Sequence, residues 1–371
     1  MGASRRCHRP PSRGRRSASV RVRSARALLL VLVSAAAATG CTGAPLEEWT
    51  LDLEQELELG GEPVSLETAF FRPMGLGFDY RANVYVLDSG NHRVQVFSPD
   101  GTFLRSVGEP GVGPGQLTDA QGLFVHPDGR LWIADTRGRR LQPYAADGRP
   151  LPPLTLEMFP LDLVVAPDRI FVLRLPQTSM VYGPDRQPLV SVLDHHGNVT
   201  GGFVEPVPST VGILYMLENL LALAPAPGNG VAVANTHFAS LVRLYRTGGQ
   251  PDGEIPVLYK AGAWAPLGRR PAEINDASIA RVARTASDLA WDEKRQLYWV
   301  LSGYVDQTPE GEWIVGREAY RYSPDGTYRG SVMLAERATS LAAGPDGRLW
   351  TIDIEGVVRG YRVTDPDTAP Q

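Results

Sequence analysis

A short strand–turn–strand pattern recurs along this chain and constrains its fold more than any other feature. Residues 83–108 read NVYVLDSGNHRVQVFSPDGTFLRSVG. Three runs rich in Val, Leu, Phe and Tyr partly alternate between apolar and polar residues, which is typical of half-buried strands. The two turns between them, Asp-Ser-Gly-Asn and Ser-Pro-Asp-Gly, consist of residues that favour tight or left-handed backbone. The stretch therefore predicts three consecutive strands.

The same pattern returns much later in the chain. The VYVLD and FSPDGTF segments of the first unit have close copies at a spacing that fits a unit of about 40 to 50 residues. The copies are LWIAD at 131–135, LWTID at 349–353 and YSPDGTY at 322–328. Several strands per unit at this period predict the blades of a propeller.

Residues 72–154 resemble two tandem NHL repeats, and DSGNHRVQVF at 88–97 is the most specific part of the match. Six segments align by hand, each with an apolar strand, a turn often marked Pro-Asp and a second apolar strand. We therefore predict an all-β fold, a six-bladed β-propeller of four-stranded antiparallel blades, of the bacterial lipoprotein type. The expected blades are about 71–117, 118–157, 158–205, 216–260, 284–335, and 336–365 together with 48–60.

The sixth segment has no fourth strand before the sequence ends. Residues 49–59, WTLDLEQELEL, alternate like a strand and precede the first blade. We predict that this N-terminal strand lies beside 357–363 and closes the ring, because closure removes exposed sheet edges. The alternative is a short acidic helix over 46–59, which the Leu and Glu content favours on propensity alone.

Residues 1–40 have the composition of an export signal. They hold nine arginines and no acidic residue, and 27–38 are apolar or small apart from Ser34. That core is shorter than the roughly 20 residues that span a bilayer, but it suits a signal peptide. The ending Ala-Thr-Gly-Cys41 resembles a lipobox, although Ala38 stands where Leu is usual. The alternative is an ordinary cleavage site.

The lipobox resemblance implies that Cys41 is lipidated and that 41–47 form the mature N-terminus and a short linker. The membrane is then a partner through the lipid. The expected location is the cell envelope, on the periplasmic side of the outer membrane where the cell has two membranes. Cys7, the other cysteine, leaves with the leader, so no internal disulfide is expected.

Loss of the leader changes the charge of the chain. Removing nine arginines from the 37 basic residues leaves 28 against 41 acidic ones, a net charge of −13. This balance argues against a nucleic-acid partner, whose phosphates need a basic surface. We expect a monomer.

Extra length is concentrated in the connections that a propeller places on one face. These insertions are 176–188, 206–215, 260–285 and 305–316. Their aromatic and arginine side chains suit a recognition surface. The candidate ligand-binding residues are Tyr182, Tyr215, Trp264, Arg269, Arg270, Tyr304 and Trp313. The alternative is that these loops pack together and plug the channel.

Catalytic signals are sparse. No nucleophile elbow, phosphate loop or cysteine-based metal motif is present, so no catalytic residue is assigned. Asp162 and Asp288 begin the inner strands of blades three and five, and Asn219 stands one residue before the matching position of blade four. Such oxygens around an axis suit calcium, the one cofactor considered, as in gluconolactonase-like propellers. Asp88, Asp135 and Asp353 follow the second strands of their blades and are expected to bond the backbone of the turn that comes next.

Two functions remain open at this point. The favoured one is a lipid-anchored, non-catalytic module that binds a protein, peptide or glycan of the envelope on the insertion-rich face. The alternative is a metal-dependent hydrolase or lyase of the gluconolactonase or amidating-lyase kind. A propeller can host either, so the residues at the site must decide.

Overall fold

The computed structural model divides the chain into two compact units, Met1–Ala44 and Pro45–Gln371. Only residues of the second unit are described. Within these ranges, no helix is long and apolar enough to cross a membrane. The described residues are 50–60, 68–176, 178–179, 183–184, 187–208, 215–216, 219–236, 241–257, 286–302, 305–307, 313–315 and 317–364.

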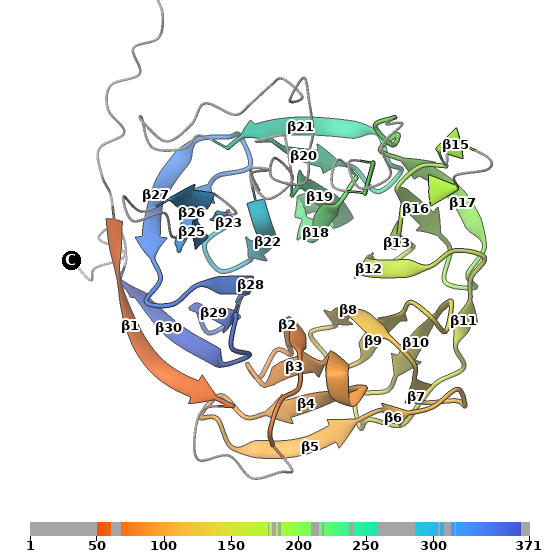
Figure 1. The fold of residues 1–371 in the computed structure, drawn as a ribbon, viewed down its shortest axis with the longest axis horizontal. Coiled ribbons are helices and arrows are strands. Elements are labelled where there is room, and N and C mark those ends of the chain that lie inside the picture. The colour runs from red at the N-terminus through yellow and green to blue at the C-terminus, as the bar shows by residue number, and fades with distance from the viewer. Residues whose placement is uncertain are drawn as a thin grey trace, which may run out of the picture. The chain divides into compact units, whose positions relative to one another are not determined.

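The second unit is a ring of antiparallel sheets (Figure 1). Each blade has four strands, called a to d from the axis outward. In chain order they are β2 Pro73–Phe78, β3 Val84–Asp88, β4 Arg93–Phe97, β5 Phe103–Val107; β8 Ala120–Val125, β9 Leu131–Asp135, β10 Arg140–Tyr144, β11 Leu154–Thr155; β12 Pro160–Val165, β13 Ile170–Arg174, β16 Val190–Leu193, β17 Val199–Phe203; β18 Leu221–Ala226, β19 Gly230–Asn235, β20 Leu241–Tyr245, β21 Pro251–Pro256; β22 Ala286–Asp292, β23 Leu297–Ser302, β26 Glu318–Tyr322, β27 Tyr328–Met333; and β28 Ala338–Ala343, β29 Arg348–Asp353, β30 Val358–Thr364, β1 Thr50–Leu59.

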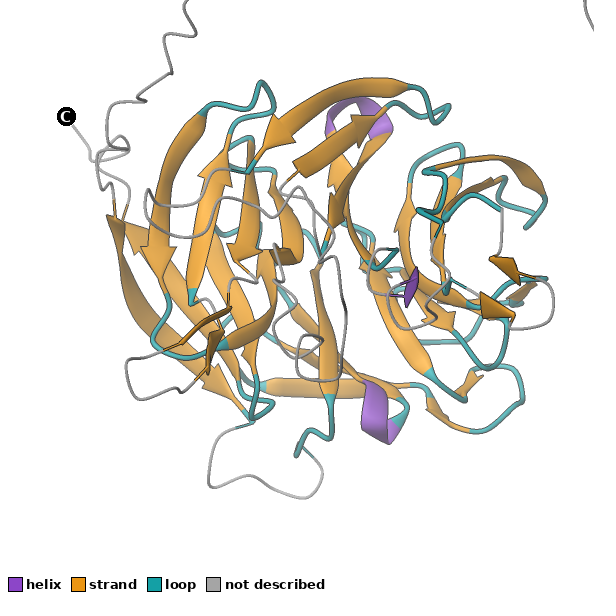
Figure 2. Cartoon of the chain, turned by 45° about the horizontal axis from the view of Figure 1, so that its top comes forward, coloured by secondary structure: helices purple, strands orange, loops and turns teal. Residues whose placement is uncertain are grey.

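Connections between the blade strands contain a few short elements. Figure 2 shows that strands make up most of the described chain and that helical turns are confined to connections. The short elements are the paired strands β6 Glu109–Pro110 and β7 Gln116–Leu117, β14 Thr178–Ser179 and β15 Gly183–Pro184, β24 Val305–Gln307 and β25 Trp313–Val315, and the 3-10 turns η1 Ser89–Asn91 and η2 Pro227–Asn229.

The repeated Ser-Pro-Asp-Gly turns form as the sequence predicts. In the first, the N–H of Gly101 donates to the carbonyl of Ser98 at 2.9 Å, and the copy from Ser323 to Gly326 makes the same bond at 2.9 Å. The two glycines have φ of 86° and 85°. Only glycine adopts this left-handed backbone without strain, which explains its place in each copy.

The predicted closure of the ring is confirmed. β1 pairs antiparallel with β30 from Asp52↔Thr364 to Leu59↔Val358. The acidic side chains of β1 face arginines of the last blade, so opposite charges support the pairing. Glu56 accepts a hydrogen bond from Arg348 Nε at 2.6 Å, and this bond is the main reason that its pKa is lowered.

β1 also makes a pairing that the sequence did not predict. Thr50 and Leu51 pair in parallel with Ser331 and Val332 of β27, the outer strand of blade five. Blades five and six therefore form one eight-stranded sheet, in the order β22-β23-β26-β27-β1-β30-β29-β28. The N-terminal strand thus fastens two blades rather than one.

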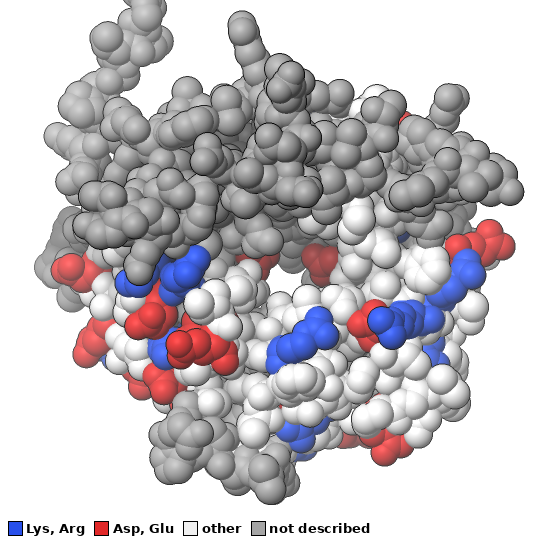
Figure 3. All heavy atoms as spheres, in the orientation of Figure 1, with Lys and Arg blue, Asp and Glu red and all other residues white. Residues whose placement is uncertain are grey.

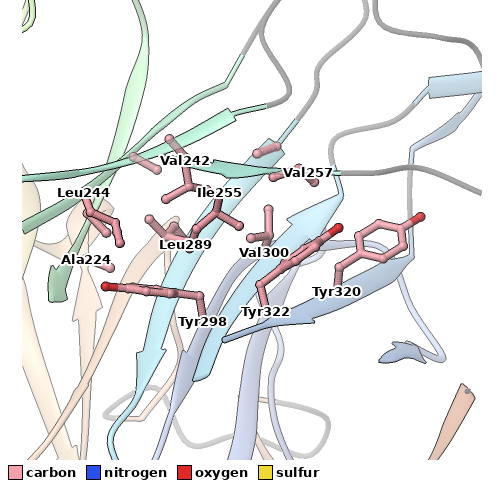
Figure 4. Close-up of a cluster of buried hydrophobic side chains, with 14 residues drawn as sticks. Ala224, Val242, Leu244, Ile255, Val257, Leu289, Tyr298, Val300, Tyr320 and Tyr322 are labelled. Atoms are coloured by element: carbon pink, nitrogen blue, oxygen red, sulfur yellow. The ribbon is translucent and has the colours of Figure 1, made fainter. Parts of the chain in front are cut away.

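The hydrophobic core lies between blades. Each of the six buried clusters joins the facing sides of two adjacent blades. Figure 4 shows the one between blades four and five, where Val242 and Ile255 meet Leu289, Tyr298 and Val300. A blade cannot bury both of its faces alone, so the ring is stabilised by contacts between neighbouring blades.

The antiparallel order of strands gives the ring two faces. The a–b and c–d turns form what we call the short-turn face, and the d–a and b–c connections form the insertion face. The expectation for the aspartates after strand b is confirmed for Asp353, whose Oδ1 accepts the N–H groups of Glu355 and Val357 in the b–c turn, both at 2.9 Å. It was wrong for Asp88 and Asp135. Asp88 Oδ1 accepts the N–H of Phe71 at 2.7 Å and Asp135 Oδ1 that of Asp119 at 2.8 Å, both in d–a connections. These carboxylates also pair with arginines of strand c, so they fasten the connection between blades.

Candidate functional site

The inner strands share an irregularity at the insertion-face end. Five of the six contain a β-bulge directly after their first residue, and β18 has none. The residue after each bulge lines the central channel. In all five strands, the residue that follows this channel-lining residue is a leucine. These post-bulge residues are Gly75, Gly122, Asp162, Asp288 and Ser340.

A cavity of about 500 Å³ occupies the channel and is lined by the inner strands of all six blades. Figure 3 shows the hollow at the centre of the ring. Most of its wall is apolar, and the charged residues that line it are Asp79, Asp162, Asp288 and Glu293. No lysine, arginine or histidine is among the described residues that line it.

Asp288 connects blade five to blade six. Its Oδ2 accepts the hydroxyl of Ser340 at 2.6 Å and the N–H of Leu341 at 2.9 Å. Its Oδ1 accepts the N–H of Leu289 at 2.8 Å. Burial raises the pKa of Asp288, and these three hydrogen bonds oppose the rise because they favour the ionised form.

Asp162 connects blades three and four in the same way, but fewer hydrogen-bond donors bond its carboxyl group. It accepts the N–H of Leu163 at 2.8 Å, and the N–H of Leu223 in β18 also bonds it. Burial, and after it the negative charge of Asp288, raises the pKa of Asp162 to about 7. The carboxyl group therefore changes its charge near neutral pH.

The structure brings Asp162 and Asp288 together in one cavity, as the repeat position predicts, but it does not bring Asn219 there. The side chain of Asn219 is buried, where it accepts the N–H of Val207 at 2.7 Å and donates to the carbonyl of Tyr215 at 2.7 Å. Among the described residues, no three His, Cys, Asp or Glu side chains gather around one point. Calcium takes about 6–8 oxygen ligands, more than two carboxylates supply. Calcium therefore remains a prediction.

The predicted ligand-binding residues of the loops are mostly not described. Tyr215 is fully buried, so its side chain packs inside the protein and is not available on the surface. The structure describes Trp313 only through its backbone, which belongs to β25. The remaining residues lie outside the described ranges: Cys41, Tyr182, Trp264, Arg269, Arg270 and Tyr304.

Sequence reasoning missed a group of exposed apolar side chains on the insertion face. Ten large hydrophobic residues are exposed among those described, and seven of them lie on d–a or b–c connections or at the adjoining strand end. Their position could have been inferred from the strand boundaries, but their exposure could not. The seven are Phe71, Met74, Val112, Val207, Met216, Met333 and Ile354.

Comparisons with known proteins agree on the architecture. A family model described as a 6-bladed beta-propeller, DUF5128, matches residues 78–187. A DUF4221 family member from Bacteroides vulgatus is 12% identical with a TM-score of 0.59, over 85% of this chain and 99% of that one. A protein from Bacteroides fragilis is 12% identical with a TM-score of 0.55, over 84% and 96%.

A virginiamycin B lyase from Staphylococcus aureus is more distant, at 10% identity and a TM-score of 0.49, over 85% of this chain and 100% of that one. No curated protein matches the sequence. Likenesses at such identities concern the fold and not the activity. From the matching family model and the ring of four-stranded sheets, we conclude that the chain is a six-bladed β-propeller.

Proposed function

We propose that this propeller is a lipid-anchored binding module of the bacterial envelope and that its insertion face holds a protein, peptide or glycan. The observation that supports this most is that seven of the ten exposed large apolar side chains among the described residues lie on that face or at a strand end beside it. Phe71 is 60% exposed and Val112 is 81% exposed. Monomeric proteins expose few such side chains together unless the surface binds something.

The other three exposed apolar residues among those described lie elsewhere. Leu104 and Val199 lie on outer strands of two different blades, and Tyr80 lies in an a–b turn. The insertions that carry Trp264 and Trp313 belong by their place in the chain to d–a and b–c connections. Aromatic residues in connections of this kind would extend the same binding surface.

The route of β1 supports an anchor that leaves the insertion face free. Because β1 runs antiparallel to β30, Thr50 lies near the end of β30, at the short-turn face. A chain anchored by a lipid on Cys41 would therefore enter the ring from that side. The eight residues between Cys41 and Thr50 give nine residue-to-residue steps, which span at most about 30 Å when extended. We infer that the insertion face is turned away from the membrane.

A second candidate function is a hydrolase or lyase that acts in the channel, with a metal ion. One observation favours it, the raised pKa of Asp162 and Asp288 in a cavity. Carboxyl groups with raised pKa values are frequent in active sites, but they also occur where carboxyl groups connect structural elements. Asp288 fits the latter description, since three donors already bond it.

The binding proposal is tested by capturing a partner from an envelope extract with the full chain. Replacing Trp264 and Trp313 by alanine should weaken capture at least about tenfold, because a central aromatic anchor contributes about 2 kcal/mol or more. Leu104→Ser, on the outer strand β5, is the matched control and should capture normally. If the variant with both changes still captures the partner, the binding site lies outside these loops. If the variant unfolds, the tryptophans are part of the core.

A further inference from the structure

The central cavity is not needed for binding on the loops, yet it has the properties of a small-molecule site. Its volume of about 500 Å³ lies within the usual 300–1,000 Å³ range for such sites. Its wall is mostly apolar, with Phe78, Phe124 and Trp291 among the lining side chains. Largely apolar cavities with a few convergent polar groups are where small ligands most often bind.

The layer of residues at the bulges has no side chain in two of the blades. Gly75 and Gly122 occupy this layer in blades one and two, so no side chain from these blades extends into it. A Cβ at Gly122 would stand 3.0 Å from Asp162 Oδ1 and 2.6 Å from the Asp162 Cα. Glycine therefore lets blade two approach Asp162 closely without covering its carboxyl group with a side chain.

The charges of the cavity are of one sign. Asp79 is bonded by the backbone N–H groups of Arg81 and Asn83 and by the Asn83 side chain, and Glu293 is bonded by the indole N–H of Trp291. These two carboxylates are thus already occupied within their turns. Asp162 has only two backbone donors, and the nearby charge of Asp288 disfavours its ionisation. No cationic residue among the described lining offsets this negative potential.

We propose that the central channel binds a small organic ammonium ion, with the cationic head at Asp162 and the apolar body along the leucines and aromatic rings of the inner strands. An ammonium group brings the positive charge that the cavity lacks and donates up to three hydrogen bonds. Its apolar body suits the apolar wall of the cavity. The same wall offers few oxygen ligands to a metal ion. Asp288 adds to the attraction through its charge, while its own hydrogen bonds keep it in place.

This site is independent of the insertion face, so it can exist whether or not a partner binds the loops. The test uses the full chain in detergent and calorimetric titration with hexylammonium and phenethylammonium, each compared with the alcohol of the same carbon skeleton. The ammonium ions should bind at least about tenfold more tightly than the alcohols, a difference that corresponds to about 1.4 kcal/mol. Equal affinities, or no binding of either ammonium ion, would overturn the proposal.

Two variants test where in the protein the ammonium ion binds. Asp162→Asn keeps the shape of the side chain and an oxygen that can accept the N–H of Leu163, and it should reduce ammonium affinity at least about tenfold. Asp128→Asn is the control, because Asp128 is an exposed carboxylate of the short-turn face that does not line the cavity. An equal loss in both variants would mean that bulk charge attracts the probe, and unchanged binding in Asp162→Asn would place the cation elsewhere. Tight calcium binding that excludes the ammonium ions would also overturn the proposal.

Discussion

Truncating the two buried leucines of β1 removes the contacts by which the N-terminal strand closes the ring. Leu51 is 5% exposed and packs with Trp299 and Val332 between blades five and six. Leu59 is 6% exposed and packs with Trp350 and Val84 between blades six and one. The two side chains therefore stabilise two different junctions of the ring.

Each change to alanine should lower the free energy of unfolding by about 2–5 kcal/mol, the range for buried leucines whose neighbours relax only in part. A typical domain is stable by about 5–15 kcal/mol in total, so each variant should be clearly destabilised. Glu54→Ala is the control on the same strand. The Glu54 side chain is 70% exposed, so we expect a change of less than about 0.5 kcal/mol.

Urea unfolding followed by tryptophan fluorescence measures these effects, since a buried tryptophan lies in each affected cluster. A ring that unfolds cooperatively should give one transition, shifted to lower urea in both leucine variants. Transitions that coincide with that of the unchanged chain would refute the closure argument, because β1 would then not belong to the cooperative unit.

The remaining predictions concern the channel and the anchor. Asp162→Asn should be more stable than the unchanged chain above pH 7 by about 4 kcal/mol. Since the folded-state pKa of about 7 exceeds the ordinary 3.8, the difference in stability between the variant and the unchanged chain should grow as pH rises from about 4 to 7 and vanish at low pH. Urea unfolding at several pH values measures this difference. A difference that does not depend on pH would contradict the prediction. Gly122→Ala should cost about 1–3 kcal/mol in thermal or urea unfolding by overpacking, whereas Gly201→Ala, where a Cβ meets nothing within 4 Å, should not. Cys41→Ser should abolish incorporation of labelled fatty acid and release the protein from membranes; unchanged labelling would exclude the lipid anchor.

The blades and their closure were predictable because they rest on local patterns. Alternation and turn residues mark the strands, and the missing fourth strand of the sixth segment assigned the alternating N-terminal segment, β1 Thr50–Leu59, to that place. The parallel pairing of β1 with β27 was not predictable, because it depends on how two finished sheets meet. The inner strands of blades three and five begin two residues before the predicted starts at Asp162 and Asp288, because a bulge interrupts the alternation on which the prediction relied.

The candidate site was predictable only in part. Asp162 and Asp288 were found because they hold the same place in two repeats, and the structure shows that each also bonds the next blade. Asn219 stands one residue before the matching position in sequence, and its amide bonds the backbone of Val207 and Tyr215 instead. The burial of Tyr215 depends on tertiary packing that residue type does not reveal.

The claim that the insertion face binds a partner is tested most directly by photo-crosslinking in cells. A photoreactive amino acid is placed singly at Val112 of the insertion face, at Tyr80 of the short-turn face and at Leu104 of an outer strand, all of them exposed positions. The proposed orientation predicts a discrete crosslinked product from Val112 and none from Tyr80 or Leu104. A product from Tyr80 or Leu104, with none from Val112, would contradict it.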